Sequence, residues 1–283
     1  MQLITMLLIN LIFSSTDLFS ATTVYNFHNS QYQSIREVSQ FLSGQAHYLL
    51  GEFHYNDKVQ NAQAHFISEM VKAHQADGAF DVHWEFLNYK SNDLIKKKFI
   101  KFKQDVLSVE QFLDSFNQSR AISYRSILNV TKKYNGQLYG VNASRKVKGQ
   151  IIKDGLGSLN PEDIPPNMKL GSAHYFERFK QVMAGHVSEE ELKAYYLAQC
   201  YTDAVMSYYM NNLSNNPLAF LIVGAFHSDY GLGTTKALRD LGKREIVNLK
   251  FVDKSLLSSA DLSVLLNPSR KLGKVADYLI LID

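Results

Sequence analysis

The sequence predicts an α/β fold: a mostly parallel central sheet flanked by helices, with an inserted helical region. Short apolar runs alternate with helical segments along the chain, which is the pattern of a parallel sheet with helical crossovers. Residues 218–223 form an unbroken apolar run, as expected for a strand buried on both faces. Polar residues and glycines follow several such runs directly, and ligands of open α/β sheets bind beyond the carboxyl ends of strands.

The composition limits the classes of function. The chain has 283 residues, of which 46% are hydrophobic and 20% charged, and this is ordinary for a globular protein. The net charge of +3 gives no reason to expect a nucleic-acid partner. Cys200 is the single cysteine, so no intrachain disulfide is possible, and we expect it to be a packed structural thiol.

The N-terminus predicts export. Residues 1–20 read as a signal segment, because residues 3–13 are mostly apolar yet too few to span a bilayer comfortably, and Ser20 and Ala21 offer a cleavage point. The usual basic start is missing, so a buried N-terminus is the alternative. We expect a periplasmic or secreted protein in which residues 21–283 form a single α/β domain, with a helical insertion near 155–212.

Caps and periodicity place the remaining elements. Ser34 with Glu37, and Ser188 with Glu191, have the spacing of helix capping boxes, and Asn56 can cap a third helix. Helices are predicted over residues 35–42, 57–73, 96–103, 121–134, 188–212 and 234–241. Strands are predicted over residues 48–53, 81–86, 137–141, 218–223, 245–252 and 276–282. Residues 25–33 receive no assignment.

Four predicted strands end in functional side chains. These are Glu52 with His54, Glu85, Asn142 with Ser144 and Arg145, and His227 with Tyr230. Because parallel strands place their carboxyl ends at one edge, we expect these groups to meet there. On the long helix, Gln199 and Asp203 are four residues apart and share a buried stripe, so they need hydrogen-bond partners.

Several chemistries fit this set of residues. The carboxylates and imidazoles could bind a divalent metal, or Glu52, His54, Glu85 and His227 could do acid–base catalysis without one. Tyr230 could ligate ferric haem as a phenolate. The sequence contains no nucleophile elbow, P-loop or Cys-x-x-Cys motif.

Three motifs resemble those of a known family. The first is Gly51-Glu52-Phe53-His54, followed by Glu85; the second is Ala198-Gln199 with Asp203 and Met206; the third is Gly224-Ala-Phe-His227 followed by Gly231. In this order they resemble the haem-binding uptake family called ChaN, which is similar to the Tiki, TraB and erythromycin-esterase group. The resemblance covers residues 48–241.

The resemblance implies an α/β fold with inserted helices, a place in the cell envelope, and haem held between two subunits of a homodimer. It implies a tyrosine ligand to the iron with a histidine nearby. Tyr230 and His227 are therefore the candidate iron ligands, with Tyr175, His174 and His186 of the insertion as alternatives. Glu52, His54, Asn142 and Arg145 are expected to line the haem site, although the segment 142–145 matches only loosely and no lipoprotein cysteine is present.

Two hypotheses follow. The first is a haem-binding protein of the cell envelope that acts in haem or iron uptake. The second is a metal-dependent or acid–base hydrolase in which Glu52 or Glu85 activates water.

Overall fold

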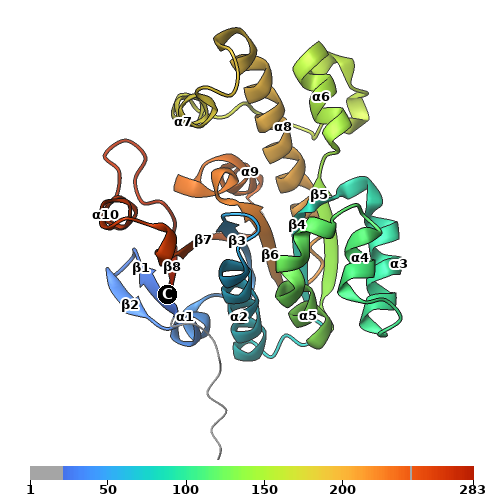
Figure 1. Ribbon diagram of the computed structural model, residues 1–283, viewed down its shortest axis with the longest axis vertical. Coiled ribbons are helices and arrows are strands. Elements are labelled where there is room, and N and C mark those ends of the chain that lie inside the picture. The colour runs from blue at the N-terminus through green and yellow to red at the C-terminus, as the bar shows by residue number, and fades with distance from the viewer. Residues whose placement is uncertain (1–21, 243) are drawn as a thin grey trace, which may run out of the picture.

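A single sheet forms the centre of the computed structural model, which describes residues 22–242 and 244–283 (Figure 1). Its strands are β1 (Thr22–Asn26), β2 (Gln31–Gln33), β3 (Ala46–Glu52), β4 (Phe80–Asn88), β5 (Gln137–Asn142), β6 (Leu218–Gly224), β7 (Glu245–Asp253) and β8 (Tyr278–Ile282). They lie in the order β2-β1-β8-β7-β3-β6-β4-β5. The strands from β8 to β5 are mutually parallel, whereas β1 pairs antiparallel with both β8 and β2. The predicted α/β class with a mostly parallel sheet is confirmed.

Helices cover both faces of this sheet. They are α1 (Ile35–Phe41), α2 (Asp57–Ala73), α3 (Asn92–Lys103), α4 (Val109–Asp114), α5 (Arg125–Lys133), α6 (Arg145–Asp154), α7 (Ala173–Met183), α8 (Glu189–Leu213), α9 (Gly233–Leu241) and α10 (Ser259–Leu266). The larger core lies between the sheet and α2 and α5, where the rings of Tyr48 and Phe220 stack at 5.6 Å. On the opposite face, Leu49 and Leu221 of the sheet pack against Met206 of α8. The strands between these layers are therefore buried on both faces.

Local sequence signals explain most helix starts. Both predicted capping boxes form, at Ser34 with Glu37 and at Ser188 with Glu191, and the side chain of Asn56 caps α2. Residues 25–33, which we left unassigned, lie in and between the antiparallel strands β1 and β2. The predicted signal segment lies outside the described residues. Within residues 22–242 and 244–283, no helix has the length and apolar character needed to cross a bilayer.

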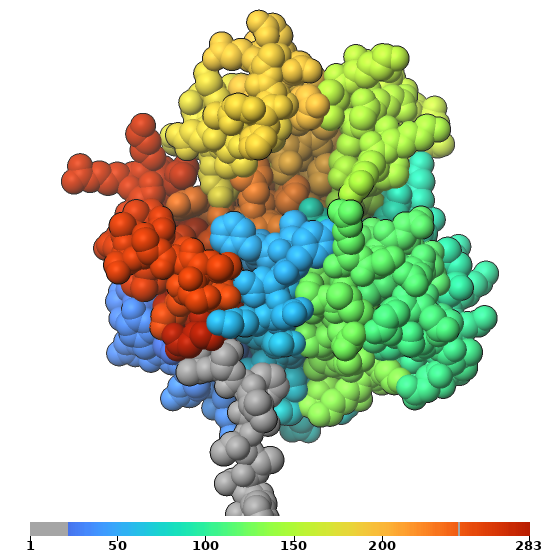
Figure 2. Space-filling view, viewed as in Figure 1, coloured from blue at the N-terminus to red at the C-terminus, as the bar shows by residue number. Residues whose placement is uncertain are grey.

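The helices α6, α7 and the upper part of α8 rise above the carboxyl edge of the parallel strands (Figure 1). Figure 2 shows a hollow between the lobe of α7 and α8 and the lobe of α6, directly above the segment that follows β3. The fold therefore positions the insertion as a roof over the carboxyl edge of the sheet.

Candidate functional site

Glu52, at the end of β3, is the buried centre of the first polar group at this edge. Its side chain accepts hydrogen bonds from Gln60 Nε2 at 2.7 Å and from the hydroxyl of Tyr124. His54 Nδ1 lies 3.0 Å from Glu52 Oε1. The carboxylate therefore fixes the orientation of the His54 ring and leaves Nε2 pointing away from Glu52.

Glu85 joins this group to the next one; it lies within β4, which continues to Asn88, two residues beyond the predicted end. Its Oε2 accepts a hydrogen bond of 2.7 Å from the backbone N–H of Gly224 and lies 4.0 Å from His54 Nε2. Its Oε1 lies 3.4 Å from His227 Nε2. Glu85 thus stands between two imidazoles that come from two different strand ends.

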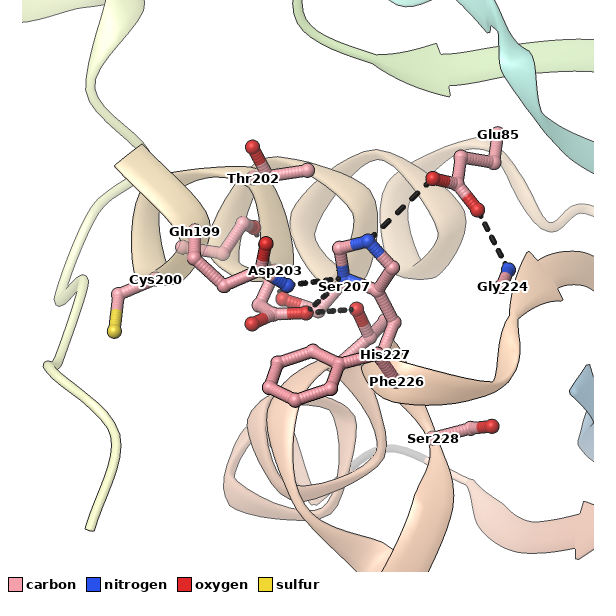
Figure 3. Close-up of polar contacts among 12 residues, drawn as sticks. Glu85, Gln199, Cys200, Thr202, Asp203, Ser207, Gly224, Phe226, His227 and Ser228 are labelled. Carbon is pink, nitrogen blue, oxygen red and sulfur yellow. Dashed lines mark hydrogen bonds and ion pairs between the residues drawn. The ribbon is translucent and has the colours of Figure 1, made fainter. Parts of the chain in front are cut away.

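His227 follows β6 and is enclosed between Glu85 and α8 (Figure 3). Its Nδ1 lies 2.7 Å from Asp203 Oδ1, and the side-chain amide of Gln199 lies 3.0 Å from the same nitrogen. Asp203 also accepts hydrogen bonds from the hydroxyl of Tyr175 at 2.7 Å and of Thr234 at 2.8 Å. The predicted stripe of Gln199 and Asp203 therefore finds its partners at the site itself.

The charges in this network reinforce one another. Burial alone would lower the pKa of His227, but Asp203 and Glu85 raise it to about 10. Burial would raise the pKa of Glu85, but His227 and then His54 lower it to about 2. At neutral pH, His227 is therefore a buried cation between two carboxylates, and not a group that is poised to exchange protons.

Glu52 and His54 differ from Glu85 and His227, because the carboxyl group of Glu52 has a raised pKa whereas that of Glu85 has a lowered one. Burial raises the pKa of Glu52, against the hydrogen bonds from His54, Tyr124 and Gln60. Burial lowers the pKa of His54, but Glu52 and Glu85 raise it further than burial lowers it, so it lies above its ordinary value. Glu52 and His54 are thus the groups of the edge that can share a proton between them.

Tyr230 belongs to a neighbouring cluster. The guanidinium of Arg178, on α7, lies 5.1 Å from the centre of the Tyr230 ring and donates to Asp229 Oδ2 at 2.7 Å. Lys250, buried on β7, donates to both oxygens of Asp229 at 2.8 Å. Whereas His227 packs against α8, Tyr230 packs under α7, so the two candidate iron ligands have different surroundings.

Two tyrosines of the carboxyl edge adopt a left-handed backbone. Tyr55 has φ 63° and Tyr230 has φ 60°, a conformation that is uncommon for bulky residues and concentrates at functional sites. Each follows the histidine of its strand end, His54 or His227. Tyr55 is 51% exposed, and its ring stacks on Phe86 at 5.4 Å. Sequence reasoning did not single out Tyr55, although the adjacent His54 marked its position.

The remaining candidates are less closely connected. Asn142 is buried and its Oδ1 has no hydrogen-bond partner among the described residues, while Arg145 is exposed at the start of α6. Tyr175 is buried against Asp203, whereas His174 and His186 are exposed. Neither Gln60 nor Tyr124 was predicted to take part, because each lies in a helical segment without a distinguishing motif. In the described part of the chain, no group of three or more His, Cys, Asp or Glu residues is arranged to hold a metal ion.

Comparisons with known proteins give a matching family and a similar solved structure. Residues 38–238 match the family described as "Haem-binding uptake, Tiki superfamily, ChaN". No curated protein matches the sequence. A solved structure titled "Cofacial heme binding to ChaN of Campylobacter jejuni" is similar over 93% of this chain and 97% of that chain, with a TM-score of 0.70 and 17% identity.

More distant structures share less of the fold. A Bacillus cereus protein has a TM-score of 0.48 at 10% identity and covers 88% of this chain and 92% of that chain. The erythromycin esterase EreC has a TM-score of 0.42 at 14% identity, with 75% and 71% covered. The family match spans well over half of the sequence and includes each of the three motifs at the carboxyl edge. This chain therefore belongs to the haem-binding uptake family of the Tiki superfamily, the ChaN family.

Proposed function

We propose that this protein binds haem at the carboxyl edge of its sheet and acts in haem or iron uptake in the cell envelope. Family membership supports the haem, and the surface beside His54 supports the place. The observation that carries the proposal is Tyr55: an exposed tyrosine in a left-handed conformation, next to an imidazole whose other nitrogen is fixed by a buried carboxylate.

Tyr55 is the iron ligand that this geometry favours. A phenolate is an established ligand of ferric haem. The ring of His54 lies 6.0 Å from the ring of Tyr55, so an imidazole held by Glu52 stands beside the proposed ligand. The exposed ring of Phe53 and the ring of Phe86 add apolar surface suited to a flat macrocycle. When bound, haem would supply iron and redox chemistry that the chain itself lacks.

Tyr230 is the alternative ligand. It has the same backbone conformation, and the guanidinium of Arg178 lies over its ring. Both nitrogens of His227 already face carboxylates, so this histidine would have to lose one of them to bind iron. We therefore assign His227 a structural part in the site. Asn142 and Arg145 remain candidates for contacts at the rim, where an exposed guanidinium suits a propionate.

Hemin titration followed through the Soret band tests these assignments. We expect saturable binding by the native chain and at least about tenfold weaker binding by Tyr55→Phe, the loss of a direct ligand. Tyr32→Phe is the matched control, because Tyr32 is equally exposed but lies on β2. Loss of binding in Tyr230→Phe alone would move the ligand to Tyr230, and no saturable Soret band in the native chain would refute haem binding.

We also propose a homodimer in the haem-bound state. The Campylobacter ChaN structure is titled for cofacial haem binding, and two haems stacked face to face need two binding surfaces. A half-exposed tyrosine, rather than a closed pocket, suits a haem that a second subunit covers. Light scattering with and without one equivalent of hemin tests this: a mass that stays at 32 kDa in both samples would refute it.

An acid–base hydrolase remains the second candidate, favoured by the shared proton of Glu52 and His54. Both have raised pKa values, and Tyr124 adds a third polar group that can donate. Ester hydrolysis that Glu52→Gln abolishes, in a chain without hemin affinity, would establish this function. A chain that binds hemin and has no hydrolytic activity sensitive to Glu52→Gln would exclude it.

A further inference from the structure

A cavity of about 690 Å³ lies behind the site, between α8, α9 and the segment of residues 165–172 that crosses in front of them. Asp203 and Ser207 line it from α8, and Lys236 and Ala237 line it from α9. Its volume is within the range of small-molecule sites, about 300 to 1,000 Å³. The exposed side chain of Leu170 lies at its opening, so the cavity communicates with solvent.

This cavity is distinct from the carboxyl edge where we place haem. Asp203 and Tyr175 line it, but His227, Glu85, His54 and Tyr55 do not. Asp203 and Tyr175 are thus a shared wall: Asp203 contacts His227 on one side, Tyr175 donates to Asp203, and both line the cavity. An occupant would contact Asp203, the direct partner of His227, without contacting His227 itself.

The polar groups at the base of the cavity are already satisfied. Asp203 accepts hydrogen bonds from three side chains and faces the cationic His227. Ser207 donates to the carbonyl of Ala204, and burial raises the pKa of the Cys200 thiol to about 11, so that it stays neutral. The base therefore offers no unpaired charge, and with Pro165, Met168 and Leu232 also lining the cavity, it suits an apolar group.

The opening of the cavity is cationic. Lys169 and Lys236 both pair with Asp240, Lys169 at 3.9 Å, so two ammonium groups share one carboxylate. Both lysines are mostly exposed and keep their flexibility. One positive charge at the opening is therefore left for a ligand.

We propose that this cavity is a second ligand site, for an amphipathic carboxylate. The apolar body lies between α8 and α9, and the carboxylate binds at Lys169 and Lys236. Two sources share this chemistry, a fatty acid and a tetrapyrrole with propionates. The proposal goes beyond the haem site at Tyr55 and does not depend on it, because neither Tyr55 nor the alternative ligand Tyr230 lines the cavity.

Fluorescence titration with cis-parinaric acid, a fatty acid that becomes emissive in apolar sites, tests the proposal. We expect saturable binding by the native chain and its loss in Ala237→Trp, which fills the cavity from α9. In Lys236→Glu, which keeps the interior intact, we expect about tenfold weaker binding, since a like charge replaces an opposite one. Lys97→Glu, the same charge change on the exposed face of α3, is the control and should bind as the native chain does.

A competition experiment with hemin distinguishes the two sources. In a Tyr55→Phe background, displacement of parinaric acid by hemin identifies a tetrapyrrole site. Parinaric acid that stays bound in the presence of hemin identifies a fatty-acid site. The proposal is overturned if Ala237→Trp removes the binding of neither parinaric acid nor hemin. It is also overturned if Lys236→Glu and Lys97→Glu bind parinaric acid equally well. Failure of hemin to bind at Tyr55 would leave these results unchanged, so the two proposals fail separately.

Discussion

Asp203→Asn should remove the main support of the buried His227 cation. The rise of the His227 pKa from 6.5 to about 10 corresponds to roughly 5 kcal/mol of preference for the charged form. Asp203 and Glu85 share this effect, so losing Asp203 should cost about 2 to 3 kcal/mol at pH 7, which is near the cost of breaking a buried ion pair. Asparagine keeps the shape and one acceptor oxygen, which can still accept from Thr234, while its Nδ2 would donate to the hydroxyl of Tyr175, so the change is chiefly electrostatic.

The pH dependence separates this effect from a packing defect. Because the pKa of His227 is raised on folding, its stabilisation is complete below pH 6.5 and is lost as the pH rises toward 10. The native chain should therefore lose up to about 1.4 kcal/mol of unfolding free energy per pH unit from this group between pH 7 and 9. In Asp203→Asn this slope should be less than half as steep.

Urea unfolding at pH 7, 8 and 9 measures the slope. Asp93→Asn, an equal charge change at an exposed position of α3, serves as the control and should retain the native slope. Equal slopes in the native chain and in Asp203→Asn would refute the claim that Asp203 supports the charged form of His227. A lower but parallel curve would mean that Asp203 contributes packing and hydrogen bonds alone.

Three other perturbations test the structure around the site. Gly51→Ala should lower the free energy of unfolding in urea by about 1 to 3 kcal/mol, because a Cβ there would lie 2.4 Å from Ser228 Oγ. A decrease of less than roughly 0.5 kcal/mol would contradict this packing. Lys250→Met should lower the free energy of unfolding by about 3 kcal/mol, because Lys250 donates to both carboxylate oxygens of the buried Asp229. An unchanged free energy of unfolding would show that this ion pair does not stabilise the fold. His47 is buried, and burial lowers its pKa to about 4, so the free energy of unfolding should fall as the pH drops from 6.5 toward 4. In His47→Leu, urea unfolding should show a shallower decline over this pH range. An unchanged decline would refute the assignment.

The parallel strands were predictable because each is a run of apolar residues with a turn signal at its end. All six predicted strands form, each within a few residues of its predicted limits. The hairpin of β1 and β2 was missed because an exposed edge pair needs no apolar run: Tyr32 is 57% exposed, and β2 has three residues. The short helix α4 was missed for a similar reason, since six residues provide little periodicity.

The residues of the site could be predicted from the sequence only where the topology of the sheet determines the edge at which they lie. Glu52 ends β3, Glu85 lies in the last part of β4 and His227 follows β6, so the topology of one parallel sheet brings them to one edge. Tyr124 reaches Glu52 from a sequence distance of 72 residues, through a turn whose geometry no local pattern encodes. The left-handed conformation of Tyr55 was equally hidden, because bulky residues seldom adopt it and the sequence offers no glycine there.

The insertion is an integral part of the site rather than an addition to it. Without α8, His227 would lose Asp203 and Gln199 and would retain Glu85 as its close polar partner. Without α7, Asp203 would lose Tyr175, and Asp229 would lose Arg178. Since a buried imidazolium persists only while its carboxylates surround it, the charge state of the edge depends on the position of α7 and α8. A ligand that moves α7 or α8 would therefore change the charge state of His227 and its carboxylates together.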